Sequence, residues 1–205
     1  MAETICLAFT GASGMPYGLR LLETLLAAGR RVQLLYSSTA QIVAKQEMDL
    51  DLPARAEDAQ RLLRERFKAL PGWLEVYGRE EWFAPLASGS NPPRAMVICP
   101  CSMGTLAAVA QGLASKLIER AADVVIKEGR PLILVPRETP LSVIHLENML
   151  RLARAGVVIL PPNPGFYHRP QQVTEVVDFV VARILDHLQV PHTLLQRWGD
   201  DRSER

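Results

Sequence analysis

The first forty residues alternate between short apolar segments and segments with helical spacing, and this alternation constrains the fold most strongly. Thr4–Phe9 and Arg31–Tyr36 are each typical of a buried strand. Between them, leucines recur at helical spacing from Met15 onward, and Gly29 ends this helix. A strand, a glycine loop, a helix and a second strand in this order predict the opening of a doubly wound parallel sheet.

The same alternation continues along the chain and predicts a single α/β domain over residues 1–205, with a polar tail from about residue 196. The fold class is Rossmann-like (flavodoxin-like), with three αβα layers. Further strands are expected at Trp73–Tyr77, Ala95–Cys99, Pro131–Val135 and Val157–Leu160. Further helices are expected at Ala40–Glu47, Glu57–Ala69, Leu106–Gly112, Ser115–Glu128, Leu141–Ala155 and Gln172–Leu188, and residues 84–93 are expected to form a loop.

Charge and hydropathy exclude several classes of protein. The chain has 205 residues, and its 23 Lys and Arg nearly balance its 22 Asp and Glu, which argues against binding to nucleic acid. No apolar run reaches the ~18–20 residues that cross a bilayer. The N-terminus lacks the basic region of a signal peptide, and three cysteines do not form a disulfide framework. We therefore expect a cytoplasmic protein without a membrane span.

Glycine and hydroxyl side chains follow the predicted strands, at the carboxyl edge where open parallel sheets bind ligands. The loop Gly11–Gly14 is suited to phosphate, because its backbone N–H groups are accessible and a helix N-terminus follows. It lacks the G-x-G-x-x-G spacing, and Tyr36 and Ser37 stand where NAD proteins carry an acid for the ribose. A monophosphate cofactor such as FMN fits better than NAD. The segment 102–105 adds a second set of phosphate donors at a helix start.

The ionisable residues in and after the later strands allow two readings. Spacing alone favours a solvated ladder of ion pairs for Arg120 and Lys127, which share a helix face with nearby acids. Arg137 and Glu138 follow a buried strand between two prolines, which favours phosphate binding and proton transfer. Arg183 lies at the edge of an apolar stripe, where it either covers apolar surface or reaches for an anion.

The cysteines and histidines receive no chemical role. Cys99 and Cys101 are too few and too close for a zinc site, and we expect them to be small buried side chains. His145 and His168 each have a structural alternative. The Tyr167 hydroxyl is able to donate to a phosphate. No cluster of metal ligands is apparent, and no metal is expected.

Several separated motifs, in order, resemble the UbiX family of flavin prenyltransferases from about Thr4 to Trp198. They are TGASGMPYGLRLL, ASGS, MVICPCSMGTLAA, LIERAADVVIKE, PLILVPRETPLSVIHLENML, PPNPGFYHRPQ and DFVVARIL. The resemblance implies transfer of a dimethylallyl group from dimethylallyl monophosphate to N5 and C6 of reduced FMN, without a metal. It also implies that a UbiD-type decarboxylase receives the prenylated FMN. A homo-oligomer, a dodecamer by resemblance, would hold its sites between subunits.

The resemblance assigns roles residue by residue. The positions that match flavin-binding residues are Gly11, Ala12, Ser13, Ser37, Ser102, Met103, Gly104, Thr105 and Arg137. The positions that match the binding site for dimethylallyl phosphate are Arg120, Lys127, Tyr167, Arg183 and Trp198, with Trp198 an aromatic near the prenyl pocket. The implied catalytic residues are Ser13, Glu47, Lys127 and Glu138, and Glu138 is the first candidate for proton transfer.

Three alternatives stay open. FMN-dependent cysteine decarboxylases of the related flavoproteins carry a PASANT-type motif where this chain has Pro100–Thr105, and the mismatch counts against them. A non-catalytic FMN-binding or carrier protein would not need the set Lys127, Arg137, Glu138, Tyr167 and Arg183. A short-chain NAD dehydrogenase would need an acidic ribose ligand and a Tyr-x-x-x-Lys pair, and neither is evident.

Overall fold

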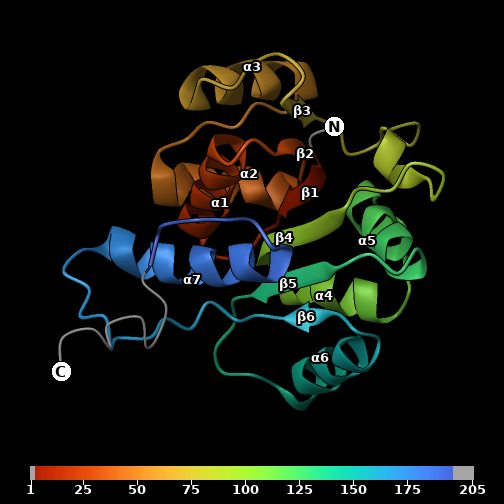
Figure 1. The fold of residues 1–205 in the computed structure, drawn as a ribbon. Helices are drawn as coiled ribbons and strands as arrows, with labels where there is room; N and C mark the ends of the chain where they lie inside the picture. The colour runs from red at the N-terminus through yellow and green to blue at the C-terminus, as the bar shows by residue number, and fades with distance from the viewer. Residues whose placement is uncertain (1–2, 196–205) are drawn as a thin grey trace.

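The computed structural model describes residues 3–195, and they form one six-stranded sheet with helices on both faces (Figure 1). The strands are β1 (Thr4–Phe9), β2 (Arg31–Tyr36), β3 (Leu74–Val76), β4 (Ala95–Cys101), β5 (Leu132–Pro136) and β6 (Val158–Ile159). The helices are α1 (Met15–Ala27), α2 (Ser38–Met48), α3 (Ala56–Phe67), the 3-10 helix η1 (Pro85–Ala87), α4 (Met103–Ala110), α5 (Leu117–Lys127), α6 (Val143–Arg154) and α7 (Val173–Leu188).

All neighbouring strands are parallel, in the order β3-β2-β1-β4-β5-β6. The predicted doubly wound α/β fold is therefore confirmed, with the strand order of dinucleotide-binding domains. The order reverses between β1 and β4, and ligands of such sheets bind beside the carboxyl ends at this reversal. The loops after β1 and β4 are the two glycine- and serine-containing loops that the sequence singles out.

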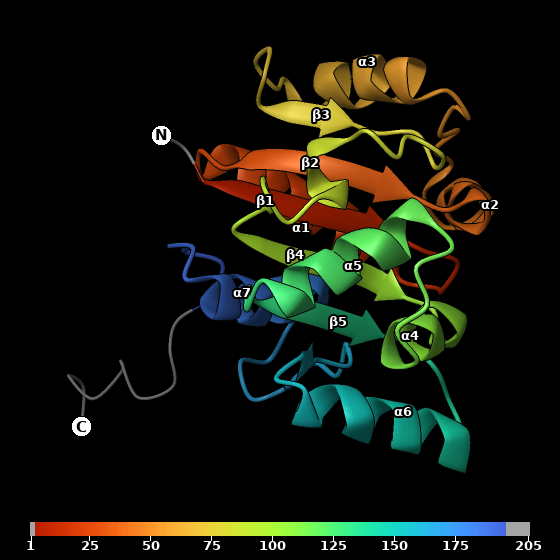
Figure 2. The ribbon, with the colours of Figure 1, turned by 90° about the vertical axis from the view of Figure 1, so that its right-hand side faces the viewer.

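Side chains that alternate along β1 face two separate cores. Ile5, Leu7 and Phe9 pack with α1, α2, α3 and α7, whereas Cys6 and Ala8 pack with α4, α5 and α6. Figure 2 shows α5 in front of the sheet and α7 behind it. Residues on α5 and residues on α7 are thus separated by the full thickness of the sheet.

Gly18 allows α1 to lie directly on the sheet. A Cβ atom at this position would be 2.5 Å from the carbonyl oxygen of Cys99 and 2.9 Å from the ring of Phe9. Pro16 is in the first turn of the helix, as predicted, where its missing N–H leaves no hydrogen bond unmade. The start of α1 is therefore held close to the carboxyl end of β4.

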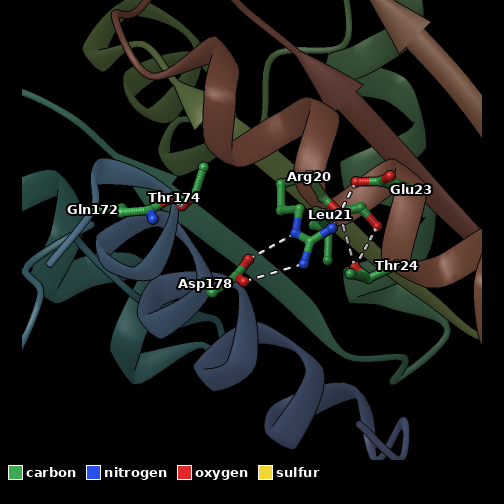
Figure 3. A network of polar contacts seen from close by, with 7 residues as sticks. All are labelled: Arg20, Leu21, Glu23, Thr24, Gln172, Thr174 and Asp178. Carbon is green, nitrogen blue, oxygen red and sulfur yellow. Dashed lines mark hydrogen bonds and ion pairs between the residues drawn. The ribbon is translucent and has the colours of Figure 1, made fainter. Parts of the chain in front are cut away.

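An ion pair joins α1 to α7 on the first face of the sheet (Figure 3). Arg20 Nε is 2.7 Å from Asp178 Oδ1, and Arg20 Nη2 is 3.1 Å from Asp178 Oδ2. The remaining Nη1 donates to Glu23 at 2.8 Å. Two parallel N–H···O bonds fix orientation as well as distance, so α7 is aligned on α1 by more than apolar packing.

Several element boundaries differ from the sequence prediction, and three differences bear on the site or the sheet edge. Helix α4 begins at Met103 rather than Leu106, because Ser102 Oγ accepts from the backbone N–H of Thr105 and caps the helix there. The expected loop 84–93 contains η1, and β3 is shorter than expected. Within residues 3–195, no helix is long and apolar enough to cross a membrane.

Candidate functional site

Thr10 ties together the loops that follow β1 and β4. Its hydroxyl donates to the carbonyl oxygen of Pro100 at 2.8 Å and accepts from the N–H of Ser102 at 2.7 Å. Its own N–H also donates to Pro100 O, at 3.2 Å. The side chain is buried, so these bonds fix the two loops side by side at the reversal of strand order.

The loop after β1 also touches the start of α2. A Cβ atom at Gly11 would lie 2.4 Å from Thr39 Oγ1, so only glycine permits this approach. Ser37 Oγ is 2.9 Å from Thr39 Oγ1 and accepts from the N–H of Ala40 at 3.1 Å. The predicted flavin-binding positions Gly11 and Ser37 are thereby brought to one place, beside exposed Ser13.

The N-terminus of α1 is already bound by a carboxylate of the chain itself. Glu47, on α2, accepts from the N–H of Gly14 at 3.0 Å and from the N–H of Met15 at 2.8 Å. The negative charge that we expected a ligand phosphate to place at this helix end is supplied by Glu47. Gly14 has φ 123°, a conformation that strongly favours glycine.

The N-terminus of α4 offers donors on the other side of the same edge. Ser102 Oγ lies 3.0 Å from Thr105 Oγ1, and a Cβ atom at Gly104 would have nothing within 4 Å. The space above this first turn is open, so a phosphate is able to approach the turn. These predicted flavin-binding positions lie together with Met103, which is buried beneath them.

A cavity of about 450 Å3 lies at the carboxyl end of β2. The loop that starts α2 and the first residues of α5 form its walls, and its polar side chains include Ser37 and Arg79. The residues that line it are Leu35, Tyr36, Ser37, Ser38, Thr39, Arg79, Glu80, Lys116, Leu117 and Ile118. Its place beside a predicted flavin ligand and its mixed lining suit part of a cofactor-sized molecule.

Arg137 and Glu138 follow β5 at the same edge. The N–H of Arg137 donates to Cys101 O at 3.4 Å, and its Nε donates to Ser13 O at 3.4 Å. Both residues are exposed. Within residues 3–195, the Glu138 carboxylate accepts one hydrogen bond, from the N–H of Thr139 at 3.2 Å. The structure thus places a cation and an available carboxylate beside the glycine loop.

The three cysteines lie beneath this edge as buried, unpaired thiols. Burial raises the pKa of the Cys101 thiol to about 12, and the pKa of Cys6 to about 12. Near neutral pH both groups stay protonated and are poor nucleophiles. The prediction that Cys99 and Cys101 are small buried side chains is confirmed.

The cations of α5 gather around the turn after η1. Arg120 Nε donates to Ala87 O at 3.0 Å, and Arg120 Nη1 contacts Asp123 at 2.9 Å. Lys127 Nζ is 2.5 Å from Glu128 Oε1, and a Cβ atom at Gly89 would meet both side chains. The ASGS segment, residues 87–90, carries no charged side chain and no spacing that points to these cations. Its contact with these cations is therefore a feature that sequence reasoning missed.

Tyr167 and Arg183 are both placed by α7, on the other side of the sheet. The Tyr167 ring meets Phe179 edge to face, with centroids 5.8 Å apart, and His168 stacks on the same phenyl ring at 5.4 Å. Arg183 follows Phe179 by four residues, so it lies on the same face of α7. Both Tyr167 and Arg183 are exposed. Trp198, predicted near the prenyl pocket, lies outside the described residues.

The predicted phosphate ligands therefore form two groups rather than one. Arg120 and Lys127 are on the α5 side of the sheet, and Tyr167 and Arg183 are on the α7 side (Figure 2). A sheet of close-packed side chains lies between them. In the described part of the chain, no three His, Cys, Asp or Glu side chains are placed to hold a metal ion.

Comparison with known proteins gives consistent results. The Flavoprotein family model matches residues 2–185. The flavin prenyltransferase UbiX of Pseudomonas aeruginosa is 58% identical over 198 residues, which cover 97% of this chain and 95% of that protein. The crystal structure of AnUbiX in complex with FMN and dimethylallyl pyrophosphate has a TM-score of 0.86 and 38% identity, and the match covers 97% of this chain and 98% of that chain.

A second crystal structure adds the state of assembly of a relative. The dodecameric FMN-dependent UbiX-like decarboxylase of Escherichia coli O157:H7 has a TM-score of 0.84 and 40% identity, over 96% of this chain and 99% of that chain. The motifs, the strand order and the loops at the carboxyl edge agree with these similarities. The chain belongs to the UbiX family of flavin prenyltransferases, within the Flavoprotein family.

Proposed function

We propose that this protein transfers a dimethylallyl group from dimethylallyl monophosphate to N5 and C6 of reduced FMN. The observation that carries the proposal is the meeting of three polar loops, after β1, β4 and β5, at the reversal of strand order. Family membership supports the reaction class. A relative crystallised with FMN and dimethylallyl pyrophosphate supports the pair of substrates.

The chain's donors fit a flavin monophosphate at this edge. Reduced FMN supplies the two nucleophilic ring atoms when it is bound. Gly104 at the open end of α4, Ser37 and the exposed Ser13 offer N–H and hydroxyl donors for its phosphate and ribityl chain. Arg137, held beside Ser13, supplies a cation near the ring. Glu47 keeps the glycine loop in position through the N–H groups of Gly14 and Met15.

The two groups of predicted phosphate ligands suit the leaving phosphate of the donor. We call them the two cationic groups: Arg120 and Lys127 on α5, and Arg183 on α7 with Tyr167. As the allylic C–O bond breaks, the bonding electron pair stays with the phosphate and negative charge grows there. Lys127, Arg183 and the Tyr167 hydroxyl stabilise that charge, and Arg120 holds the turn at Ala87 on the Lys127 side. Fixed donors that are aimed at developing charge typically contribute a rate factor of about 100 to 1,000 each.

Forming the two carbon bonds requires proton transfers: N5 and C6 each lose a proton, and the C=C bond of the transferred group gains one when C6 bonds to it. Glu138 is our candidate base, because it is exposed next to the glycine loop and its carboxylate has capacity to accept. Ser13 is exposed at the same edge, and its carbonyl oxygen accepts from Arg137 Nε; its hydroxyl is our candidate to position or relay a proton. Glu47 already accepts two backbone N–H groups, so its place in the reaction is through the loop that it holds.

The two cationic groups are able to form one site only when a second copy of the chain supplies one of them. We propose that the protein forms a homo-oligomer, a dodecamer as in the Escherichia coli relative, with sites between subunits. Helix α6 presents apolar side chains that suit such contacts, with Val143 69% and Ile144 67% exposed. We further propose that the protein acts in the cytoplasm and passes prenylated FMN to a UbiD-type decarboxylase.

The proposal is tested by mixing the purified protein with reduced FMN and dimethylallyl monophosphate under anaerobic conditions. Mass spectrometry of the released flavin should show a gain of one five-carbon unit. Parallel reactions with dimethylallyl pyrophosphate and with a peptide that ends in cysteine distinguish donor preference and cysteine decarboxylation. An unchanged flavin mass with both donors overturns the proposal, and a decarboxylated peptide would favour the related decarboxylases instead.

A further inference from the structure

Arg183 is held at one end of a short chain of contacts on α7. Its Nη1 is 2.7 Å from Asp186 Oδ2, one helical turn away. The other oxygen of the same carboxylate, Oδ1, is 3.2 Å from His192 Nε2. An ionised carboxylate only accepts hydrogen bonds, so His192 Nε2 carries the proton in this contact. Asp186 therefore stands between Arg183 and His192, with one oxygen for each.

The backbone after α7 brings His192 to this place. Gln189 adopts φ 56° and ends the helix, and the chain turns back so that Val190 N–H donates to Leu185 O at 3.0 Å. Val190 is buried in the core, and the His192 side chain is only 13% exposed. Figure 1 shows this segment returning along α7. The imidazole is thus fixed by the fold, whereas Arg183 is exposed.

Within the described part of the chain, one of the three guanidinium nitrogens of Arg183 makes a hydrogen bond. Among residues 3–195, Nη1 has a hydrogen-bond partner, and Nε and Nη2 have none. An exposed arginine loses much rotamer freedom when it binds an anion, and a contact that has already fixed the side chain removes part of that loss. The remaining N–H groups stay available for a bidentate contact with phosphate.

We propose that Asp186 and His192 are positioning residues that hold Arg183 ready for the phosphate of the prenyl donor. The inference rests on the proposed function, because it takes Arg183 as a ligand of that phosphate. Asp186 orients the guanidinium, and His192 fixes the carboxylate in turn. Neither residue touches the substrate. Both act by ordering Arg183 before the donor binds, so their loss weakens donor affinity, while Arg183 itself stays in place to stabilise the leaving phosphate.

The test compares His192→Ala with His192→Gln, because glutamine places an N–H donor near the position of Nε2. Titration calorimetry of FMN-loaded protein with dimethylallyl monophosphate, and initial rates, give Kd, KM and kcat. We expect His192→Ala to raise Kd and KM by about 3- to 10-fold, as for one side chain that must be ordered on binding. His192→Gln restores both values, and kcat changes by less than about two-fold in each variant.

Matched controls separate positioning from other roles. His187→Ala removes an exposed imidazole of the same helix that makes no hydrogen bond within the described residues, and should match the wild type. FMN affinity and oligomer size should be unchanged in all variants. Asp186→Ala tests whether the carboxylate helps or hinders donor binding. If Asp186 positions Arg183, the variant binds the donor more weakly. If Asp186 only competes with the phosphate for Arg183, the variant binds the donor more tightly.

The outcomes are separable from failure of the proposed function. If the wild type neither binds dimethylallyl monophosphate nor prenylates FMN, the proposed function fails and this inference falls with it. If the wild type is active, the inference alone is overturned by equal donor affinities in His192→Ala and wild type. It is also overturned by tighter binding in Asp186→Ala, or by a loss in His192→Gln as large as in His192→Ala.

Discussion

The carboxyl edge of the sheet and the cationic helix faces differ in how they are held together. At the edge, buried Thr10 and capping Glu47 fix the loops through hydrogen bonds within one chain. The cations of α5 and α7 are instead divided between opposite faces of the sheet. One chain can thus prepare a flavin site, but a phosphate site that uses both cationic groups needs two chains. Variants at the edge and on the two helices can therefore distinguish a site that one chain builds from a site that two chains build.

The largest effect is expected from Lys127→Ala. Loss of this cation should lower the prenylation rate by about 100-fold or more, because charge on the leaving phosphate is no longer stabilised. FMN affinity, which we assign to the carboxyl edge, should stay within about two-fold, because distant sites act independently. Rates by mass spectrometry and flavin fluorescence titration measure the two quantities. The matched control is Arg130→Ala, an exposed cation just beyond α5, and an equal loss there would contradict the assignment.

Mixed oligomers test the sharing of sites directly. Lys127→Ala and Arg183→Ala chains, each nearly inactive alone, should regain activity when they are co-expressed. If each site takes Lys127 from one chain and Arg183 from its neighbour, random assembly leaves about a quarter of the sites intact. The activity of the purified mixture is compared with that of each parent. A mixture no more active than its parents would mean that each chain builds its own site.

Glu138→Ala should separate chemistry from binding at the edge itself. We expect a fall of about 100-fold in the single-turnover rate, typical for loss of a general base, with FMN affinity unchanged. Stopped-flow absorbance of the flavin follows the reaction. Glu65→Ala, an exposed acid on α3, is the control for a general effect of lost negative charge. An unchanged single-turnover rate removes Glu138 from the mechanism.

Gly11→Ala should lower the stability of the protein at the carboxyl edge and leave the cations of α5 and α7 unchanged. The new Cβ atom would lie 2.4 Å from Thr39 Oγ1, so the loop and α2 must separate. Overpacking of this kind typically costs about 1–3 kcal/mol, or roughly 3–10 °C in Tm for a chain of this size. Gly104→Ala, where nothing lies within 4 Å, should keep its Tm within about 2 °C. Equal Tm values for the two variants would show that the contact is not restrictive.

Cys101→Ala should have the smallest effect. Burial holds the pKa of this thiol at about 12, so it is protonated and takes no part in the reaction. The prenylation rate should change by less than about two-fold, and iodoacetamide at pH 8 should leave Cys101 of the native protein unmodified. A ten-fold loss of rate, or rapid alkylation, would show instead that the thiol is accessible and reactive.

The fold could be predicted from the sequence because each segment's apolar pattern matches the element that it forms, and the order of these elements matches a parallel sheet. Buried strands and amphipathic helices alternate, and parallel topology follows from that alternation. The apolar spacing predicts α4 only from Leu106, although residues 102–105 are expected at a helix start, because the first turn after the cap at Ser102 carries little apolar pattern of its own. The edge strand β3 covers Leu74–Val76, which is shorter than the predicted Trp73–Tyr77. An edge strand pairs on one side only, so the apolar pattern of the sequence does not mark where its pairing ends.

The candidate site was predictable only in part. The loops after β1 and β4 follow from the rule for open sheets, and the structure brings Gly11 and Ser37 together as expected. The contact between Glu47 and Gly14 joins residues 33 positions apart and has no sequence signature. The separation of Lys127 from Arg183 depends on which face of the sheet each helix covers. Helical spacing shows which residues share a helix face, and it does not show what that face meets.

The pair Arg20–Asp178 has a mechanical consequence. Helix α1 begins at the glycine loop after β1, and α7 carries Arg183. Two parallel hydrogen bonds between them resist rotation of one helix against the other. A shift at the start of α1 would therefore carry α7 with it. Without this ion pair, the alignment of the two helices would rest on their apolar packing.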